Sequence, residues 1–195
     1  MINYALICPS LPYSFFLAGS VGVSALRELL QQKNGANAHR VLIYLSLHSN
    51  ALHDSGIKAF AKCLKTNQTL TYLSLGMETD TTLRTFTHSH THLCTSTENN
   101  QITNKGVRYL SKHLEKNRVL TTLSLPSNQI GDEGLVTLSE ALGPKKNATL
   151  LLLNVERNPF SPKGAELFWK GIAANGAEAA IRPNAAEFEF LQVYI

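Results

Sequence analysis

One spacing pattern of leucine, asparagine and glycine occurs four times along the chain and limits the folds that it can adopt. The pattern is Leu-x-x-Leu-x-Leu-x-x-Asn-x-apolar, followed by Gly-apolar-x-x-apolar-x-x-x-apolar. Its first copy consists of Leu42, Leu45, Leu47, Asn50, Leu52, Gly56, Ile57, Phe60 and Leu64. Repeats of this length are typical of solenoids, in which each unit buries its apolar face only by stacking against neighbouring units.

The other copies divide the chain into units. Copies that begin at Leu120 and Leu150 keep every offset of the first, whereas the copy that begins at Leu70 breaks and resumes at Asn100. Removal of residues 76–97 would restore the period, so we interpret this segment as an insertion. Residues 1–41 then form a degenerate N-terminal repeat or cap, and residues 178–195 form a C-terminal cap or tail. The four repeat units between them are 42–69, 70–119 with the insertion 76–97, 120–149 and 150–177.

Each unit is expected to contain one strand and one helix. Leu45 and Leu47 lie two residues apart, which places both side chains on one face of a strand and exposes the residues between them on the other. Val107, Leu110 and Leu114 form one apolar stripe on a helix. The pattern predicts an α/β solenoid, and no matching strand is recognised ahead of the helical residues 22–30.

These residues resemble leucine-rich repeats of the ribonuclease-inhibitor subtype, which also occur in NOD-like receptors and in the GTPase-activating protein for Ran. The resemblance covers residues 42–175 well and residues 20–41 weakly. It implies a curved array with a parallel sheet on the concave side and helices on the convex side. It also implies protein binding, but no common chemistry.

The concave face is the candidate binding surface. Tyr44 and Tyr72 are expected to stack side by side as a partner-binding anchor, although strand propensity alone could also account for two tyrosines there. The candidate binding residues on this face are Tyr44, Ser46, His48, Tyr72, Ser74, Thr122, Ser124, Asn154 and Glu156. Leu152 is expected on the same face.

The repeated asparagine and glycine are interpreted as structural residues. Each asparagine follows a strand, where its amide is expected to satisfy backbone groups within its own unit and toward the next. The resulting ladder would contain Asn50, Asn100, Asn128 and Asn158. The glycine at the start of each helix is expected to allow a close backbone approach.

Motifs of nucleotide-hydrolysing enzymes, serine hydrolases and zinc proteases are absent from the sequence, so we expect neither catalysis nor a cofactor. The predicted function is a non-catalytic module, expected to be monomeric, that binds a protein partner. The resemblance permits one alternative, a GTPase-activating or other regulatory protein of the Ran type. A minor alternative is metal binding by the insertion, where an extended chain would place His88, His90, His92 and Cys94 on one side.

Composition favours a cytoplasmic protein that contacts proteins. The net charge is +4, but its basic residues cluster on two helices and not on the concave face, so nucleic acid is an unlikely ligand; contact of the basic helices with nucleic acid or acidic lipid is retained as an alternative. The three cysteines show no paired spacing, and no apolar run is long enough for a membrane span. The glycosylation-like triplets at Asn67 and Asn147 arise from the repeat itself.

Overall fold

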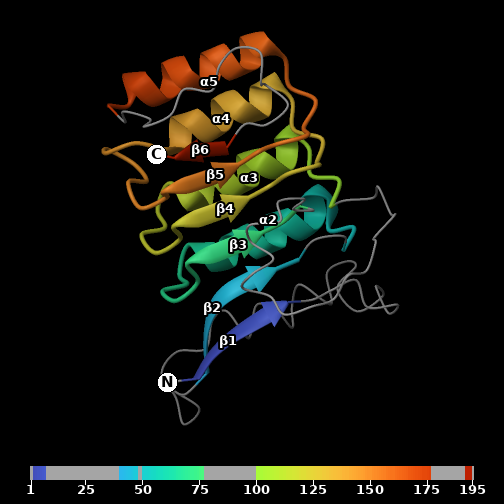
Figure 1. Ribbon diagram of the computed structural model, residues 1–195, viewed down its shortest axis with the longest axis vertical. Coiled ribbons are helices and arrows are strands. Elements are labelled where there is room, and N and C mark those ends of the chain that lie inside the picture. The colour runs from blue at the N-terminus through green and yellow to red at the C-terminus, as the bar shows by residue number, and fades with distance from the viewer. Residues whose placement is uncertain (1, 8–39, 48–49, 77–99, 177–191, 195) are drawn as a thin grey trace.

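The computed structural model describes residues 2–7, 40–47, 50–76, 100–176 and 192–194. Its strands form a single sheet in which the spatial order equals the order in the chain (Figure 1). The six strands are β1 (Ile2–Ile7), β2 (Arg40–Ser46), β3 (Tyr72–Ser74), β4 (Thr122–Ser124), β5 (Leu152–Asn154) and β6 (Gln192–Tyr194).

In the described part of the chain, four helices form a second layer on one face of this sheet (Figure 1). They are α2 (His53–Leu64), α3 (Asn104–Leu114), α4 (Asp132–Ala141) and α5 (Pro162–Ala174). Each helix follows its strand and packs beside the helix of the next unit. Within the described ranges, no helix is long and apolar enough to cross a lipid bilayer.

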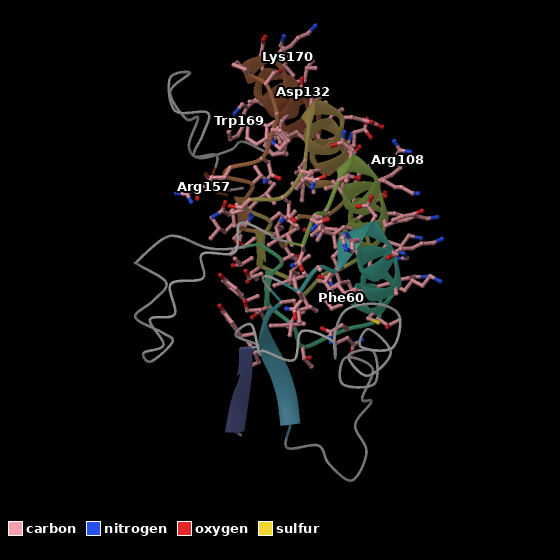
Figure 2. The ribbon with its side chains drawn as sticks, turned by 90° about the vertical axis from the view of Figure 1, so that its right-hand side faces the viewer. Phe60, Arg108, Asp132, Arg157, Trp169 and Lys170 are labelled. Atoms are coloured by element: carbon pink, nitrogen blue, oxygen red, sulfur yellow. The ribbon has the colours of Figure 1, made fainter. Side chains whose placement is uncertain are left out.

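The core lies between the two layers. The strand leucines Leu45, Leu73, Leu123 and Leu153 are completely buried, and they are direct partners in the register of β2 to β5. Helix residues such as Phe60 meet them from the other side (Figure 2). Because the leucine spacing matches the strand period and the apolar stripe matches the helix period, all four units share one continuous core, and the predicted α/β solenoid is confirmed.

The first strand corrects one expectation. We recognised no strand ahead of residues 22–30, but β1 pairs in parallel with β2, with Ile2 opposite Arg40 and Ile7 opposite Ser46. The strand is an uninterrupted run, INYALI, without the leucine and asparagine landmarks of the repeat. Its β-branched and aromatic residues favour a strand by propensity, a signal that a search for the repeat pattern does not detect.

The last strand runs in the opposite direction to the others. β6 pairs antiparallel with β5, so that Tyr194 lies opposite Leu152 and Gln192 opposite Asn154. An unpaired edge strand is a template for association with other chains. The final residues of the predicted C-terminal tail therefore cover the edge of β5.

One residue of the predicted insertion, Gly76, lies among the described residues. Gly76 is buried, its carbonyl accepts a hydrogen bond from the Ser74 hydroxyl, and a Cβ atom at this position would collide with the backbone of Pro126. Gly76 is thus packed into the array beside the next unit. The remainder of the predicted insertion, residues 77–97, lies outside the described residues.

Candidate protein-binding face

The face of the sheet that points away from the helices carries one row of half-buried side chains. We call this row, formed by Tyr44, Tyr72, Thr122 and Leu152, the sheet-face row; its members are direct partners in the register of β2 to β5. Alternation along each strand puts these side chains opposite the buried leucines. The row therefore presents two aromatic rings, a hydroxyl and an aliphatic group along one line across the sheet.

The two tyrosines of this row stack on one another, as their equivalent positions in neighbouring units predict. Their ring centroids lie 4.2 Å apart and the ring planes differ by 14°. Parallel strands about 4.8 Å apart hold equivalent residues at this separation, so the stacking follows from the register. Stacked rings present a large, rigid area that mixes apolar and polar character, which suits a contact surface.

A second row on the same face is buried, contrary to our expectation that the residues between the leucines are exposed. Ser46, Ser74, Ser124 and Asn154 are between 1% and 6% exposed. The Ser74 hydroxyl turns back onto the Gly76 carbonyl at 3.2 Å. The Asn154 amide oxygen accepts a bond from the Glu156 backbone.

Two further candidates on this face have different outcomes. Glu156 is 9% exposed, so it also differs from the expected exposed position. His48 lies outside the described residues. Fewer of the candidate residues are therefore accessible than the sequence suggested. Among the described residues of this face, the sheet-face row is the main accessible part.

The repeated asparagines join consecutive units where the strands end. The Asn100 amide nitrogen donates to the carbonyls of Leu47 and Leu75 at 2.8 and 2.7 Å, and its oxygen accepts from the backbone of Asn50 and Leu52 at 3.0 and 3.3 Å. Asn128 and Asn158 make equivalent bonds one and two units later, accepting from Ile102 and Ile130. Asn50 is buried at the start of this row.

Asn100, Asn128 and Asn158 make the expected bonds within their own units, but their bonds to a neighbouring unit reach back to the preceding one and not forward to the next. The cause is the sheet ladder. The Leu47 backbone N–H donates to Ser74 of the following unit, which leaves the Leu47 carbonyl at the end of the ladder in need of a donor. Asn100 supplies that donor, and Asn128 and Asn158 donate in the same way to Leu75 and Leu125.

Comparison with a protein-family profile agrees with this architecture. A family profile described as Leucine Rich repeat matches residues 38–61, 116–139 and 146–168, which are parts of the first, third and fourth units with their flanks. The array is a leucine-rich repeat solenoid. Among solved structures, the chain is similar to "Leiomodin-1 Actin-Binding Site 2 (ABS2)", with 16% identity, a TM-score of 0.48, and coverage of 81% of this chain and 76% of that one. A search of curated proteins gives no match.

The leucine-rich repeats contain a second asparagine row that our reading of the sequence missed. Asn67, Asn117 and Asn147 lie three residues before the first leucine of a unit and are at most 6% exposed. Asn117 donates to the Leu64 carbonyl at the end of α2, and Asn147 donates to the Leu114 carbonyl at the end of α3. Their constant position, three residues before the first leucine, was the sequence signal by which this row could have been found. Because these amides are buried and bonded, the glycosylation-like triplets at Asn67 and Asn147 have a structural cause.

A third polar network at the helix starts was also missed. In each case a polar side chain in the first turn of one helix holds the residue that precedes the next helix. The Asp54 carboxylate accepts from the backbone and hydroxyl of Thr103 at 2.9 and 2.7 Å, and the Asp132 carboxylate accepts from Ser161 at 2.6 and 2.7 Å. Asn104 accepts from the Gly131 backbone at 2.7 Å. These bonds with Ser161 lower the pKa of Asp132.

The glycine of each repeat makes room for this network. A Cβ atom at Gly106, Gly134 or Gly164 would lie closer than 3.0 Å to Asp54, Asn104 or Asp132 respectively. None of these three glycines has a positive φ, so their role is the close approach that we predicted and not a left-handed backbone. The polar side chain at the start of one helix can therefore occupy its place only because the next helix has a glycine there.

The metal-binding alternative remains a prediction. His88, His90, His92 and Cys94 lie outside the described residues. Elsewhere in the chain, the described residues contain no cluster of three or more side chains suited to hold a metal ion.

Proposed function

We propose that this protein is a non-catalytic interaction module that binds a protein partner through the sheet-face row. The observation that carries the proposal is the stacked pair of Tyr44 and Tyr72, half-buried on two neighbouring parallel strands of the sheet. Aromatic residues dominate binding energy when they form the centre of an interface, and rigid ones lose little conformational entropy on binding. Thr122 and Leu152 extend the same row with a small polar group and an aliphatic one.

Three finer parts of this proposal, the repeat subtype, the location and the oligomeric state, each have support of their own. Each unit carries a full α-helix on the outer layer, which is the form that the ribonuclease-inhibitor subtype would take. The three cysteines of the chain show no paired spacing, which fits a reducing compartment and hence a cytoplasmic location. A monomeric state accords with the pairing of β5 by β6 at one edge of the sheet.

The test is affinity capture from native lysate, identification of the bound protein, and titration of the purified pair. Replacing both Tyr44 and Tyr72 by alanine should weaken binding about 30-fold or more, because anchor residues contribute about 2 kcal/mol or more. Leu167→Ala is the matched control, since Leu167 is a large apolar side chain exposed on α5 in the helix layer. Unchanged affinity of the double variant, with the fold verified by circular dichroism, would remove the sheet-face row from the proposal.

The regulatory alternative uses a protein contact of the same general kind, and the same capture distinguishes it. A protein that regulates a GTPase as the Ran activator does should retain a small GTPase among the captured proteins. It should also accelerate GTP hydrolysis at substoichiometric amounts. A partner that is held in a one-to-one complex without any turnover supports the simple binding module.

A further inference from the structure

Positive charge is concentrated on two neighbouring helices. The described segments 53–76 and 100–118, which contain α2 and α3, carry eight lysine and arginine residues and two carboxylates. Residues 119–176, which contain α4 and α5, carry five lysine and arginine residues and five carboxylates. The excess charge of the described array is therefore local to its first two complete units.

These cations share one face of the molecule. We define the basic face by the exposed lysines of α2, of α3 and of the turns after them: Lys58, Lys62, Lys65, Lys105, Lys112 and Lys116. Lysines four residues apart on a helix are separated by about 6 Å along its axis, and packed helices lie about 8–10 Å apart. In Figure 2 the nitrogen-tipped side chains of α2 and α3, including Arg108, point together away from the sheet.

The acidic groups near this face have partners other than its lysines. Asp54 accepts its bonds from Thr103, and Glu115 lies 3.9 Å from Lys146 in the turn after α4. Glu133 forms an ion pair with Arg108, whose charge is thereby balanced. Lys62, Lys65, Lys112 and Lys116 form no ion pair with any residue in the described part of the chain.

The pKa of His113 agrees with the grouping of four of these lysines. Its half-buried imidazole belongs to α3. Burial lowers the pKa of His113, and the charges of Lys112, Lys65, Lys62 and Lys116 lower it further. The ammonium groups of both helices thus act on one point, which is the arrangement that raises the local concentration of anions.

We propose that the basic face docks on the surface of an anionic lipid bilayer. Lysine is a point charge on a flexible stem, and each lysine near such a surface contributes about 1 kcal/mol, or about fivefold in partitioning. Two parallel helices with only polar side chains exposed suit contact with headgroups without insertion. The proposal goes beyond the partner-binding function, because the sheet-face row lies on the opposite side of the sheet from the helices.

Two other classes of partner fit the basic face less well. A protein interface needs an apolar centre, but the large hydrophobic residues that are exposed in the described chain, Leu151 and Leu167, do not belong to α2 or α3. Recognition of nucleic acid favours free arginines and exposed aromatic rings. Arg108 pairs with Glu133, Arg118 donates to backbone carbonyls, and Lys58 covers the ring of Tyr109 at 5.3 Å.

Vesicle sedimentation with the full chain tests the proposal. Wild type should sediment with phosphatidylcholine vesicles that contain phosphatidylserine and stay in the supernatant with phosphatidylcholine alone. The variant with Lys62, Lys65, Lys112 and Lys116 replaced by glutamine should lose about a hundredfold or more in partitioning, following the contribution of each lysine. The control replaces Lys145, Lys146, Lys163 and Lys170 by glutamine, which removes the same charge from the other half of the array and should leave binding nearly intact.

Three outcomes would overturn the proposal. The first is that wild type fails to bind phosphatidylserine vesicles at low salt. The second is an equal loss of binding in both lysine variants, which would mean that net charge and not the basic face is responsible. The third is displacement of the protein from vesicles by a DNA duplex or by polyglutamate at lower charge concentration than phosphatidylserine, which would identify a different ligand. Circular dichroism and urea unfolding verify that both variants are folded.

Discussion

Replacing Asn100 by leucine should destabilise the array more than the same replacement at Asn128. The difference arises because neighbouring asparagines share carbonyl groups. Leu75 accepts from both Asn100 and Asn128, so either asparagine can be lost without leaving this carbonyl unpaired. Leu125 is shared in the same way between Asn128 and Asn158.

The shared carbonyls set the expected magnitudes. Loss of the Asn128 amide strands the Ile102 N–H and the Pro126 carbonyl at a site that is 7% exposed, where water offers partial compensation. We expect Asn128→Leu to reduce the free energy of unfolding by about 1–3 kcal/mol. Loss of the Asn100 amide strands three groups at a completely buried site: the Leu47 carbonyl and the N–H groups of Asn50 and Leu52. About 3–5 kcal/mol is expected there.

Urea unfolding followed by circular dichroism measures both changes. Gln129→Leu is the matched control, because Gln129 is exposed in the same turn as Asn128 and should change stability by no more than about 0.5 kcal/mol. If Asn128→Leu proved as damaging as Asn100→Leu, carbonyl sharing would not determine the energetics. Stability of both variants within about 0.5 kcal/mol of wild type would refute the structural role of the asparagine row altogether.

Three other perturbations have definite expected outcomes. Gly106→Ala should lower the midpoint of urea unfolding although alanine favours helices by about 1 kcal/mol, because its Cβ would displace the Asp54 carboxylate from its hydrogen bonds with Thr103. A higher midpoint would contradict this. Bonds from Ser161 lower the pKa of Asp132, so the ionised carboxylate stabilises the fold fully above its ordinary pKa, and this stabilisation is lost as pH falls through the folded-state pKa. In thermal melts, the melting temperature of Asp132→Asn should therefore fall less on acidification than that of wild type. Ser111→Ala should leave stability unchanged or raise it by up to about 1 kcal/mol, because the buried Ser111 hydroxyl lacks a partner in the described structure, and a clear loss in the same melts would disprove this.

The sequence was sufficient to predict the layers, the register and the first asparagine row. A period of two in the strand and of three to four in the helix determines which side chains face the core, and a constant spacing between units aligns equivalent residues. The stacking of Tyr44 on Tyr72 follows from that alignment alone. β1 escaped because a strand formed by propensity carries none of the landmarks by which a repeat is recognised.

Exposure on the sheet face could not be predicted in the same way. Alternation says to which side a side chain points, but not whether its neighbours cover it. Ser124 and Thr122 point to the same side of β4, yet Ser124 is 2% exposed and Thr122 is half-buried. The second asparagine row could have been found, because Asn67, Asn117 and Asn147 share one offset. We attributed the triplets at Asn67 and Asn147 to the repeat itself, but we did not compare these positions with Asn117, which lacks the triplet.

Three polar networks fix how each unit sits against the next, a task that the apolar core cannot perform alone. Every unit presents nearly the same leucines, so burial energy changes little if one unit shifts along its neighbour. A hydrogen bond to a buried group tolerates no such shift, because its loss leaves a costly unpaired atom. The networks act at three separate places: Asn100 at the strand ends, Asn147 at the helix ends, and Asp132 at the helix starts. Three points that are not on one line define the orientation of one rigid body on another, and this keeps the members of the sheet-face row in register across four units.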